Sequence, residues 1–145
     1  MLQNMLNKNI FLDTNIVVDI IDVQRQNHQS ANILIKKLIL NNYQIVVSED
    51  MLSTIFYISK DKQKTLEFFK VIQKRWIISA FGNDVLHRGI EISLEKHLDL
   101  EDVLQCLCAK ENGCKVLITD DNQFYDCGMN IMSINKFLEI IETSI

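Results

Sequence analysis

Proline is absent from this sequence of 145 residues, and glycine occurs only four times. Turns must therefore be inferred from clusters of Asn, Asp and Ser, because the usual chain breakers are missing. No apolar run approaches the roughly 18 residues that a membrane-spanning helix needs. The first residues also lack the basic stretch followed by an apolar stretch that is typical of a secretory signal. We therefore expect a cytoplasmic protein without a membrane segment.

The overall composition is that of a globular protein. Hydrophobic residues make up 48% of the chain and charged residues 23%, which excludes a disordered or fibrous class. The length is sufficient to bury a core without disulfides or metals as staples. We expect a single domain that spans residues 1–145.

Cysteine spacing excludes the common zinc and redox motifs. The four cysteines are Cys106, Cys108, Cys114 and Cys127, and none of their spacings forms a C-x-x-C pair. Cys106 and Cys108 lie within a helical apolar pattern. The pattern predicts buried free thiols that act as small hydrophobic side chains.

A formal net charge of −4 argues against a nucleic-acid partner, but the positive charge is clustered. We call residues 60–75 the basic block; its cations are Lys60, Lys62, Lys64, Lys70, Lys74 and Arg75. A solvated helix face accounts for such a block. Contact with nucleic-acid phosphates is the less favoured explanation, and it needs only Lys and Arg within reach of a backbone. Both interpretations remain open.

Apolar runs alternate with helical patterns along the whole chain. Strands are predicted over residues 9–13, 43–47, 76–79, 115–119 and 130–134. Helices are predicted over residues 14–22, 30–41, 62–74, 83–96 and 99–112, with another from residue 49 and a last one capped by Asn135. This alternation predicts a parallel sheet with helices on both faces. The carboxyl ends of its strands then meet at one edge.

Acidic residues follow two of these strands. Asp13 closes an apolar strand, and Asp120 and Asp121 follow the strand that ends at Thr119. In an open α/β sheet, ligands bind beyond the carboxyl ends of the strands. Each acid could instead cap a helix or form a turn. Position alone leaves both interpretations open.

A third acidic group, Asp99-Leu100-Glu101-Asp102, begins a helix. Asp99 and Asp102 share a helical face, whereas Glu101 projects sideways. Helix capping explains such acids singly. Together, carboxylates at one sheet edge repel one another unless protons or a cation neutralise them. Oxygen ligands favour Mg²⁺ or Mn²⁺ over Zn²⁺, and such an ion can lower the pKa of bound water and assist phosphodiester cleavage.

Three segments, residues 11–15, 102–109 and 117–121, occur in the order and spacing of a known family. The chain resembles the PIN-domain ribonucleases. The resemblance lies in Phe11-Leu12-Asp13-Thr14-Asn15, in Asp102 to Ala109 and in Leu117 to Asp121. The resemblance implies a three-layer α/β/α sandwich with a central, mainly parallel sheet, Mg²⁺ or Mn²⁺ bound by carboxylates, and endoribonuclease activity. Small members are typically toxins of VapBC-type toxin–antitoxin pairs, so it also implies an antitoxin partner and a homodimer.

The resemblance also implies roles for individual residues. Asp13, Asp102 and Asp121 take the metal-ligand positions, Asn15 orients the site by hydrogen bonds, and Thr119 belongs to the last motif. Asp99 and Glu101 resemble extra acids of some members, and Asp99 is expected to be the better placed. The basic block is expected to carry the RNA backbone.

The second motif of the family is different here. The family usually has an acid about six residues after the serine that ends the second strand, and from Ser48 this position holds Thr54. Glu49 and Asp50 lie about one helical turn too early. In one alternative, Thr54 takes the role of the second-motif acid, and Asp99 or Glu101 compensates for the missing charge. In the other, the activity is weakened.

Three functions follow from these patterns. The leading hypothesis is a metal-dependent endoribonuclease that hydrolyses RNA phosphodiester bonds. The second is a PIN-like module that binds RNA or a protein partner without turnover. The third is a phosphatase or receiver-like domain with Asp13 as phospho-acceptor, which is disfavoured because Thr14 and Asn15 follow Asp13 where such phosphatases carry a second Asp.

Overall fold

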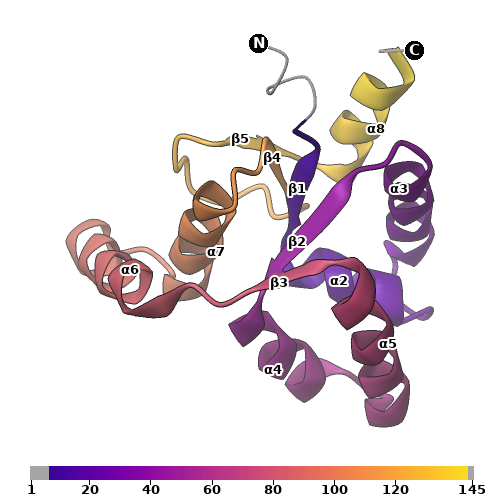
Figure 1. Ribbon diagram of the computed structural model, residues 1–145, viewed down its shortest axis with the longest axis horizontal. Helices are drawn as coiled ribbons and strands as arrows, with labels where there is room; N and C mark the ends of the chain where they lie inside the picture. Colours follow the sequence, from indigo (N-terminus) through magenta and orange to yellow (C-terminus); the bar gives the residue numbers. More distant parts are fainter. Residues whose placement is uncertain (1–6, 144–145) are drawn as a thin grey trace.

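A single parallel sheet lies at the centre of the protein (Figure 1). The computed structural model describes residues 7–143, so most of the stretch considered for a secretory signal lies outside the described residues. The strands are β1 (Asn9–Leu12), β2 (Gln44–Ser48), β3 (Ile77–Ser79), β4 (Val116–Ile118) and β5 (Asn130–Met132). They follow the order β3-β2-β1-β4-β5, and every pairing is parallel. The predicted parallel sheet is confirmed.

The central strand β1 is buried on both faces. Ile10, Phe11 and Leu12 are each at most 1% exposed, which is why the strand is a continuous apolar run instead of an alternating one. Phe11 pairs with Val46 of β2, and Leu12 pairs with Ile118 of β4. The carboxyl ends of β1, β2 and β4 therefore lie side by side.

Helices cover both faces of the sheet, as predicted. They are α2 (Thr14–Ile21), α3 (His28–Leu40), α4 (Glu49–Ile58), α5 (Lys62–Arg75), α6 (Gly82–Lys96), α7 (Leu100–Glu111) and α8 (Ile134–Thr143). In Figure 1, α7 lies on one side of the sheet, α3 and α8 lie on the other, and α6 lies outside α7. This arrangement confirms the three-layer α/β/α sandwich. No helix within residues 7–143 is long and apolar enough to cross a membrane.

The start of the last helix differs from the prediction. Asn135 was expected to cap it, but the helix begins at Ile134, and the hydroxyl of Ser133 accepts a hydrogen bond from the backbone N–H of Lys136 at 3.2 Å. The predicted strand ran to residue 134, whereas β5 ends at Met132. Ser133 is therefore free to act as the cap. Helix α3 likewise begins earlier than predicted, at His28.

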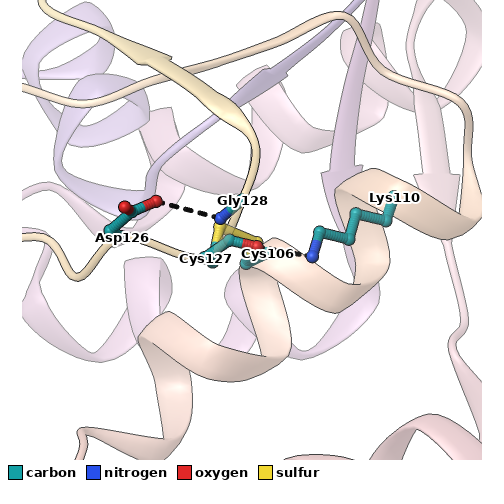
Figure 2. The surroundings of a disulfide bond; sticks show 5 residues. All are labelled: Cys106, Lys110, Asp126, Cys127 and Gly128. Carbon is teal, nitrogen blue, oxygen red and sulfur yellow. Dashed lines mark hydrogen bonds between the residues drawn. A yellow bond between two sulfur atoms is a disulfide. The ribbon is translucent and has the colours of Figure 1, made fainter.

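A disulfide contradicts the prediction that all the cysteines are free thiols. Cys106 of α7 is bonded to Cys127, which lies 21 residues further along in the segment before β5 (Figure 2). Lys110 donates a hydrogen bond to the carbonyl of Cys127, and Asp126 accepts one from the N–H of Gly128. The prediction was wrong because a spacing of 21 residues matches no motif. Cys108 and Cys114 are free, as predicted.

Candidate active site

Asp13 lies at the centre of the sheet edge where the strands end. Its side chain is 5% exposed, and its backbone N–H donates to the carbonyl of Ile118 at 3.0 Å. Asp13 occupies the N-cap position of α2, but its carboxylate makes no capping hydrogen bond. That carboxylate instead accepts a hydrogen bond from the hydroxyl of Thr119, at 2.7 Å. The capping explanation therefore does not account for this buried charge.

Thr119 connects the acids that follow β1 and β4. Its hydroxyl donates to Oδ2 of Asp13 and accepts from the backbone N–H of Asp121 at 3.1 Å. Asp120 points elsewhere, because its Oδ1 accepts from the N–H of Ile134 at 3.0 Å. Asp120 therefore serves the turn before α8. Oδ1 of Asp121 accepts from the backbone N–H of Gln123 at 2.9 Å, and the place of Asp121 among the metal ligands stays a prediction. Thr119 is 3% exposed.

Thr14 and Gln105 form a second connection that sequence reasoning missed. The hydroxyl of Thr14 donates to Oε1 of Glu101 at 2.9 Å and accepts from Nε2 of Gln105 at 3.3 Å. Both residues lie within the quoted motifs, and Gln105 follows Asp102 by about one helical turn, which was the only available signal. Oε1 of Gln105 is buried and has no hydrogen-bond partner among the described residues. The site therefore retains an unused buried acceptor.

Two acids at the start of α7, Asp99 and Glu101, make different hydrogen bonds. Oδ1 of Asp99 accepts from the backbone N–H of Asp102 at 3.2 Å, so Asp99 caps the helix. Glu101 reaches Thr14, the residue next to Asp13. The helix begins at Leu100 and the Asp99 side chain folds back onto it, and after burial it is the charge of Asp99 that does most to raise the pKa of Asp102. That Asp99 is the better placed of the two extra acids stays a prediction.

Neither Asn15 nor Thr54 takes part in the hydrogen bonds described above for residues 7–143, and their roles stay predictions. Asn15 is exposed, and within residues 7–143 its side chain makes no hydrogen bond of the kind expected to orient the site. Thr54 is half-buried in the middle of α4. The structure thus brings Asp13, Glu101, Asp102 and Asp121 together with Thr119, and leaves Asn15 outside this group.

The acids of this edge repel one another. Burial, and then the charges of Asp99, Asp13, Asp121 and Glu101, raise the pKa of Asp102 to about 7. Burial also raises the pKa of Asp13, with a smaller contribution from Asp121, although hydrogen bonds from Thr119 and Gln105 act in the opposite direction. The pKa of Glu101 is raised mainly by burial. These shared charges show that the carboxylates lie within electrostatic reach of one another.

No cation of the protein neutralises this edge in the described part of the chain. The salt bridges found there join Arg25 to Asp19, His87 to Glu91 and Arg88 to Glu111. Within residues 7–143, no three His, Cys, Asp or Glu side chains are close enough to hold a metal ion as they stand. The available donors are carboxylate oxygens and Oε1 of Gln105, a set that suits a hard divalent ion and not zinc.

The cations of the basic block lie in different parts of the structure. Nζ of Lys62 donates to the carbonyl of Tyr57 at 2.9 Å, so this lysine satisfies the end of α4. Helix α5 ends at Arg75, directly before β3 begins, and the carbonyl of Arg75 accepts from Nε2 of Gln44 at the start of β2. Lys74 and Arg75 therefore lie at the edge of the sheet opposite the carboxylates.

Known proteins resemble this chain over most of its length. Residues 10–128 match the PIN domain family. Ribonuclease VapC1 of Aquifex aeolicus (strain VF5) is 33% identical over 139 residues, which cover 93% of this chain and 96% of that protein.

Solved structures share the fold at low sequence identity. The sarcin-ricin loop cleaving toxin VapC20 of Mycobacterium tuberculosis has a TM-score of 0.67 at 14% identity, covering 83% of this chain and 95% of that one. VapBC2 of Rickettsia felis, solved with a DNA fragment from its promoter, has a TM-score of 0.66 at 19% identity, covering 86% and 98%. A toxin–antitoxin complex from Klebsiella pneumoniae has a TM-score of 0.65 at 18% identity, covering 86% and 97%.

Proposed function

Because this chain belongs to the PIN domain family, we propose that it is a metal-dependent endoribonuclease that hydrolyses RNA phosphodiester bonds. The observation that carries the proposal is the buried carboxylate of Asp13, which is held by the hydroxyl of Thr119 and lies in electrostatic reach of both Asp102 and Asp121. Four carboxylates at one strand edge, without a protein cation in the described residues, favour a bound divalent ion.

Asp13, Asp102 and Asp121 would hold Mg²⁺ or Mn²⁺. When bound, such an ion neutralises charge on a phosphoryl oxygen and lowers the pKa of water. Thr119 fixes Oδ2 of Asp13 by its hydrogen bond, and Thr14 fixes Oε1 of Glu101. These two hydroxyls keep the carboxylates oriented before RNA binds, which is the preorganisation that catalysis requires.

We also infer a biological setting for this activity. The relative named Ribonuclease VapC1 and the neighbours solved as toxin–antitoxin assemblies support the role of a toxin held inactive by an antitoxin protein. Such a toxin would act on RNA in the cytoplasm. We expect Lys60 and Lys64 to contact the RNA backbone, since Lys74 and Arg75 lie at the edge of the sheet opposite the carboxylates. A homodimer remains a prediction.

The test is RNA cleavage by the purified protein with added Mg²⁺ or Mn²⁺. Cleavage should depend on the ion and fall at least about 100-fold in Asp13→Asn, because several kcal/mol of charge stabilisation would be lost. The matched control is Asp84→Asn, which removes an exposed acid of α6 and should retain full activity. Equal cleavage by wild type and Asp13→Asn, with both folded by circular dichroism, would refute the proposal.

One observation favours a second candidate, a PIN-like module that binds RNA or protein without turnover. The position of the second-motif acid holds Thr54, which carries no charge. This candidate predicts RNA binding that weakens with salt, and no cleavage at any Mg²⁺ or Mn²⁺ concentration. The same cleavage assay, read together with filter binding, separates the two candidates.

A further inference from the structure

The segment between β4 and β5 carries a predicted metal ligand but has little regular structure. It comprises residues 119–129, all of which the structure describes, and it contains no helix or strand. Asp121 lies near its start and Cys127 near its end. The hydrogen bonds that Asp121 accepts are local, because they come from the N–H groups of Gln123 and Phe124. These bonds shape the turn, but they do not set the distance of the segment from α7.

The disulfide is a covalent link between this segment and α7 (Figure 2). Cys106 of α7 is bonded to Cys127, and Nζ of Lys110, one turn further along α7, donates to the carbonyl of Cys127. Cys106 follows Asp102 by four residues, so both lie on one face of α7. The disulfide therefore joins the helix that carries Asp102 to the segment that carries Asp121.

The fold does not need this disulfide to bury a core. A chain of 145 residues is long enough to fold without such a link. The segment also has apolar contacts that do not depend on the bond. Phe124 and Met129 pack against the main core, and Tyr125 packs against the apolar cluster formed by α6 and α7. Opening the bond should therefore loosen the segment without unfolding the protein.

The two sulfurs differ in their access to solvent. Cys106 is 0% exposed, whereas Cys127 is half-buried between the exposed residues Asp126 and Gly128. A thiolate from solvent can therefore attack Sγ of Cys127, which breaks the S–S bond and releases Cys106 as a thiolate that takes up a proton. The second thiol of a dithiol then attacks the mixed disulfide and releases Cys127. In total, the protein disulfide gains two electrons and two protons, and the dithiol becomes a disulfide.

The compartment of the proposed function makes this exchange relevant. Disulfides are rare in the reducing cytoplasm, and those that occur there are usually catalytic or redox-sensing. The proposed function has this protein act on RNA in the cytoplasm, so a role for the exchange rests on the proposed function. The C-x-x-C pair of thiol-based redox catalysts is absent from the sequence. A redox-sensing role is therefore the better match.

We propose that Cys106 and Cys127 form a thiol–disulfide switch of the metal site. In the oxidised protein, the bond holds the segment that carries Asp121 against α7. When a dithiol reduces the bond, the segment loosens, Asp121 is no longer held in place relative to Asp102, and the divalent ion binds more weakly. The reverse exchange with an oxidised disulfide restores the site.

The test compares Mn²⁺ binding to the oxidised and the reduced full chain without RNA, by isothermal titration calorimetry. The protein is reduced with dithiothreitol and desalted without oxygen, and its thiols are counted by mass spectrometry after alkylation. Reduction should weaken Mn²⁺ binding about 10-fold, the lower end of the effect of losing a group that supports a metal ligand. Reoxidation with oxidised glutathione should restore the affinity.

Two variants serve as controls. The double variant Cys106→Ala, Cys127→Ala should bind Mn²⁺ as weakly as the reduced wild type, with or without dithiothreitol. Cys114→Ala removes a half-buried free thiol and should keep the full response of the wild type to reduction. Circular dichroism should show that the reduced protein stays folded.

Three results would overturn the switch: equal Mn²⁺ affinities of the oxidised and reduced protein, a disulfide that dithiothreitol does not open in the folded protein, or unfolding on reduction. Asp13→Asn in the oxidised state is the reference for the metal site itself. If it binds Mn²⁺ as tightly as the wild type, the proposed function fails. If it binds Mn²⁺ weakly while reduction of the wild type has no effect, only the switch is overturned.

Discussion

The two edges of the sheet carry different kinds of side chain. At the amino edge, neutral or cationic donors satisfy the carbonyls of helix ends: Nδ2 of Asn9 donates to the carbonyl of Asn112 at 3.0 Å, and Nζ of Lys8 donates to that of Asn41 at 2.9 Å. At the carboxyl edge, acids raise one another's pKa values, and no salt bridge of the described residues reaches them.

This contrast separates what the fold needs from what the site needs. Helix carbonyls at the amino edge require donors, and the sequence supplies amides and lysine at that edge. Clustered carboxylates at the carboxyl edge destabilise the metal-free protein, so their presence needs a functional reason. The comparison predicts that changes at the amino edge reduce stability alone, whereas changes at the carboxyl edge reduce activity.

The largest effect on stability should come from the disulfide that ties α7 to the segment after Asp121. Replacing Cys106 and Cys127 together by Ala should lower the free energy of unfolding by about 2–4 kcal/mol, because the unfolded chain gains freedom. Urea denaturation measures this change. Cys114→Ala, at a free and partly buried thiol, should have a clearly smaller effect. Equal midpoints for the double variant and wild type would show that the link is not needed for the fold.

A substitution at the amino edge should act on stability alone. Nδ2 of Asn9, the first residue of β1, donates to the carbonyl of Asn112 at 3.0 Å. Asn9→Ala should therefore lower the free energy of unfolding by about 1–2 kcal/mol. RNA cleavage and Mn²⁺ affinity, measured below the unfolding transition, should stay at the wild-type level. A loss of Mn²⁺ affinity in this variant would remove the distinction between the edges.

The carboxyl edge should make the stability of the metal-free protein depend on pH. Because the pKa of Asp102 rises from 3.8 to about 7 on folding, the folded state holds this proton more tightly than the unfolded state. Its contribution is fully present below about pH 4 and is lost as the pH rises toward 7. After allowance for solvent screening, the loss is on the order of 1 kcal/mol.

Thermal unfolding in a chelator between pH 5 and 7 measures this dependence. Asp102→Asn should flatten the curve, and Mg²⁺ should raise the melting temperature of wild type more at pH 7 than at pH 5. A pH-independent difference between wild type and Asp102→Asn would contradict the assigned repulsion.

The smallest effect is expected in the part of the basic block that lies at the amino edge. Replacing Lys74 and Arg75 by Gln should change kcat/KM for RNA cleavage by no more than about twofold, the scale of screened surface charge. Replacing Lys60 and Lys64 by Gln should weaken RNA binding more, with a reduced dependence on salt. A larger loss in the first pair than in the second would place the RNA on the opposite side of the molecule.

Much of this contrast could be predicted from the sequence. Continuous apolar runs predicted the parallel strands, and the acids after β1 and β4 indicated the edge at which they meet. These predictions held because burial patterns and strand ends are local properties. The exact start of α8 was missed, because Ser133 and Asn135 are both good caps and the end of β5 decided between them.

The connections within the site could not be predicted in the same way. The hydrogen bonds that Thr14 makes to Glu101 and Gln105 span 87 and 91 residues, and they depend on where α7 lies relative to β1. The Cys106–Cys127 disulfide likewise depends on the path of the segment before β5.

The most direct test of the account is a crystal structure of the protein soaked with Mn²⁺, with the ion located by its anomalous scattering. The account predicts one ion at the carboxyl edge, with oxygens of Asp13, Asp102 and Asp121 within about 2.0–2.6 Å of it or linked to it by water. Carboxylates that remain apart at saturating Mn²⁺, or an ion bound elsewhere, would contradict the claim that this edge is a metal site.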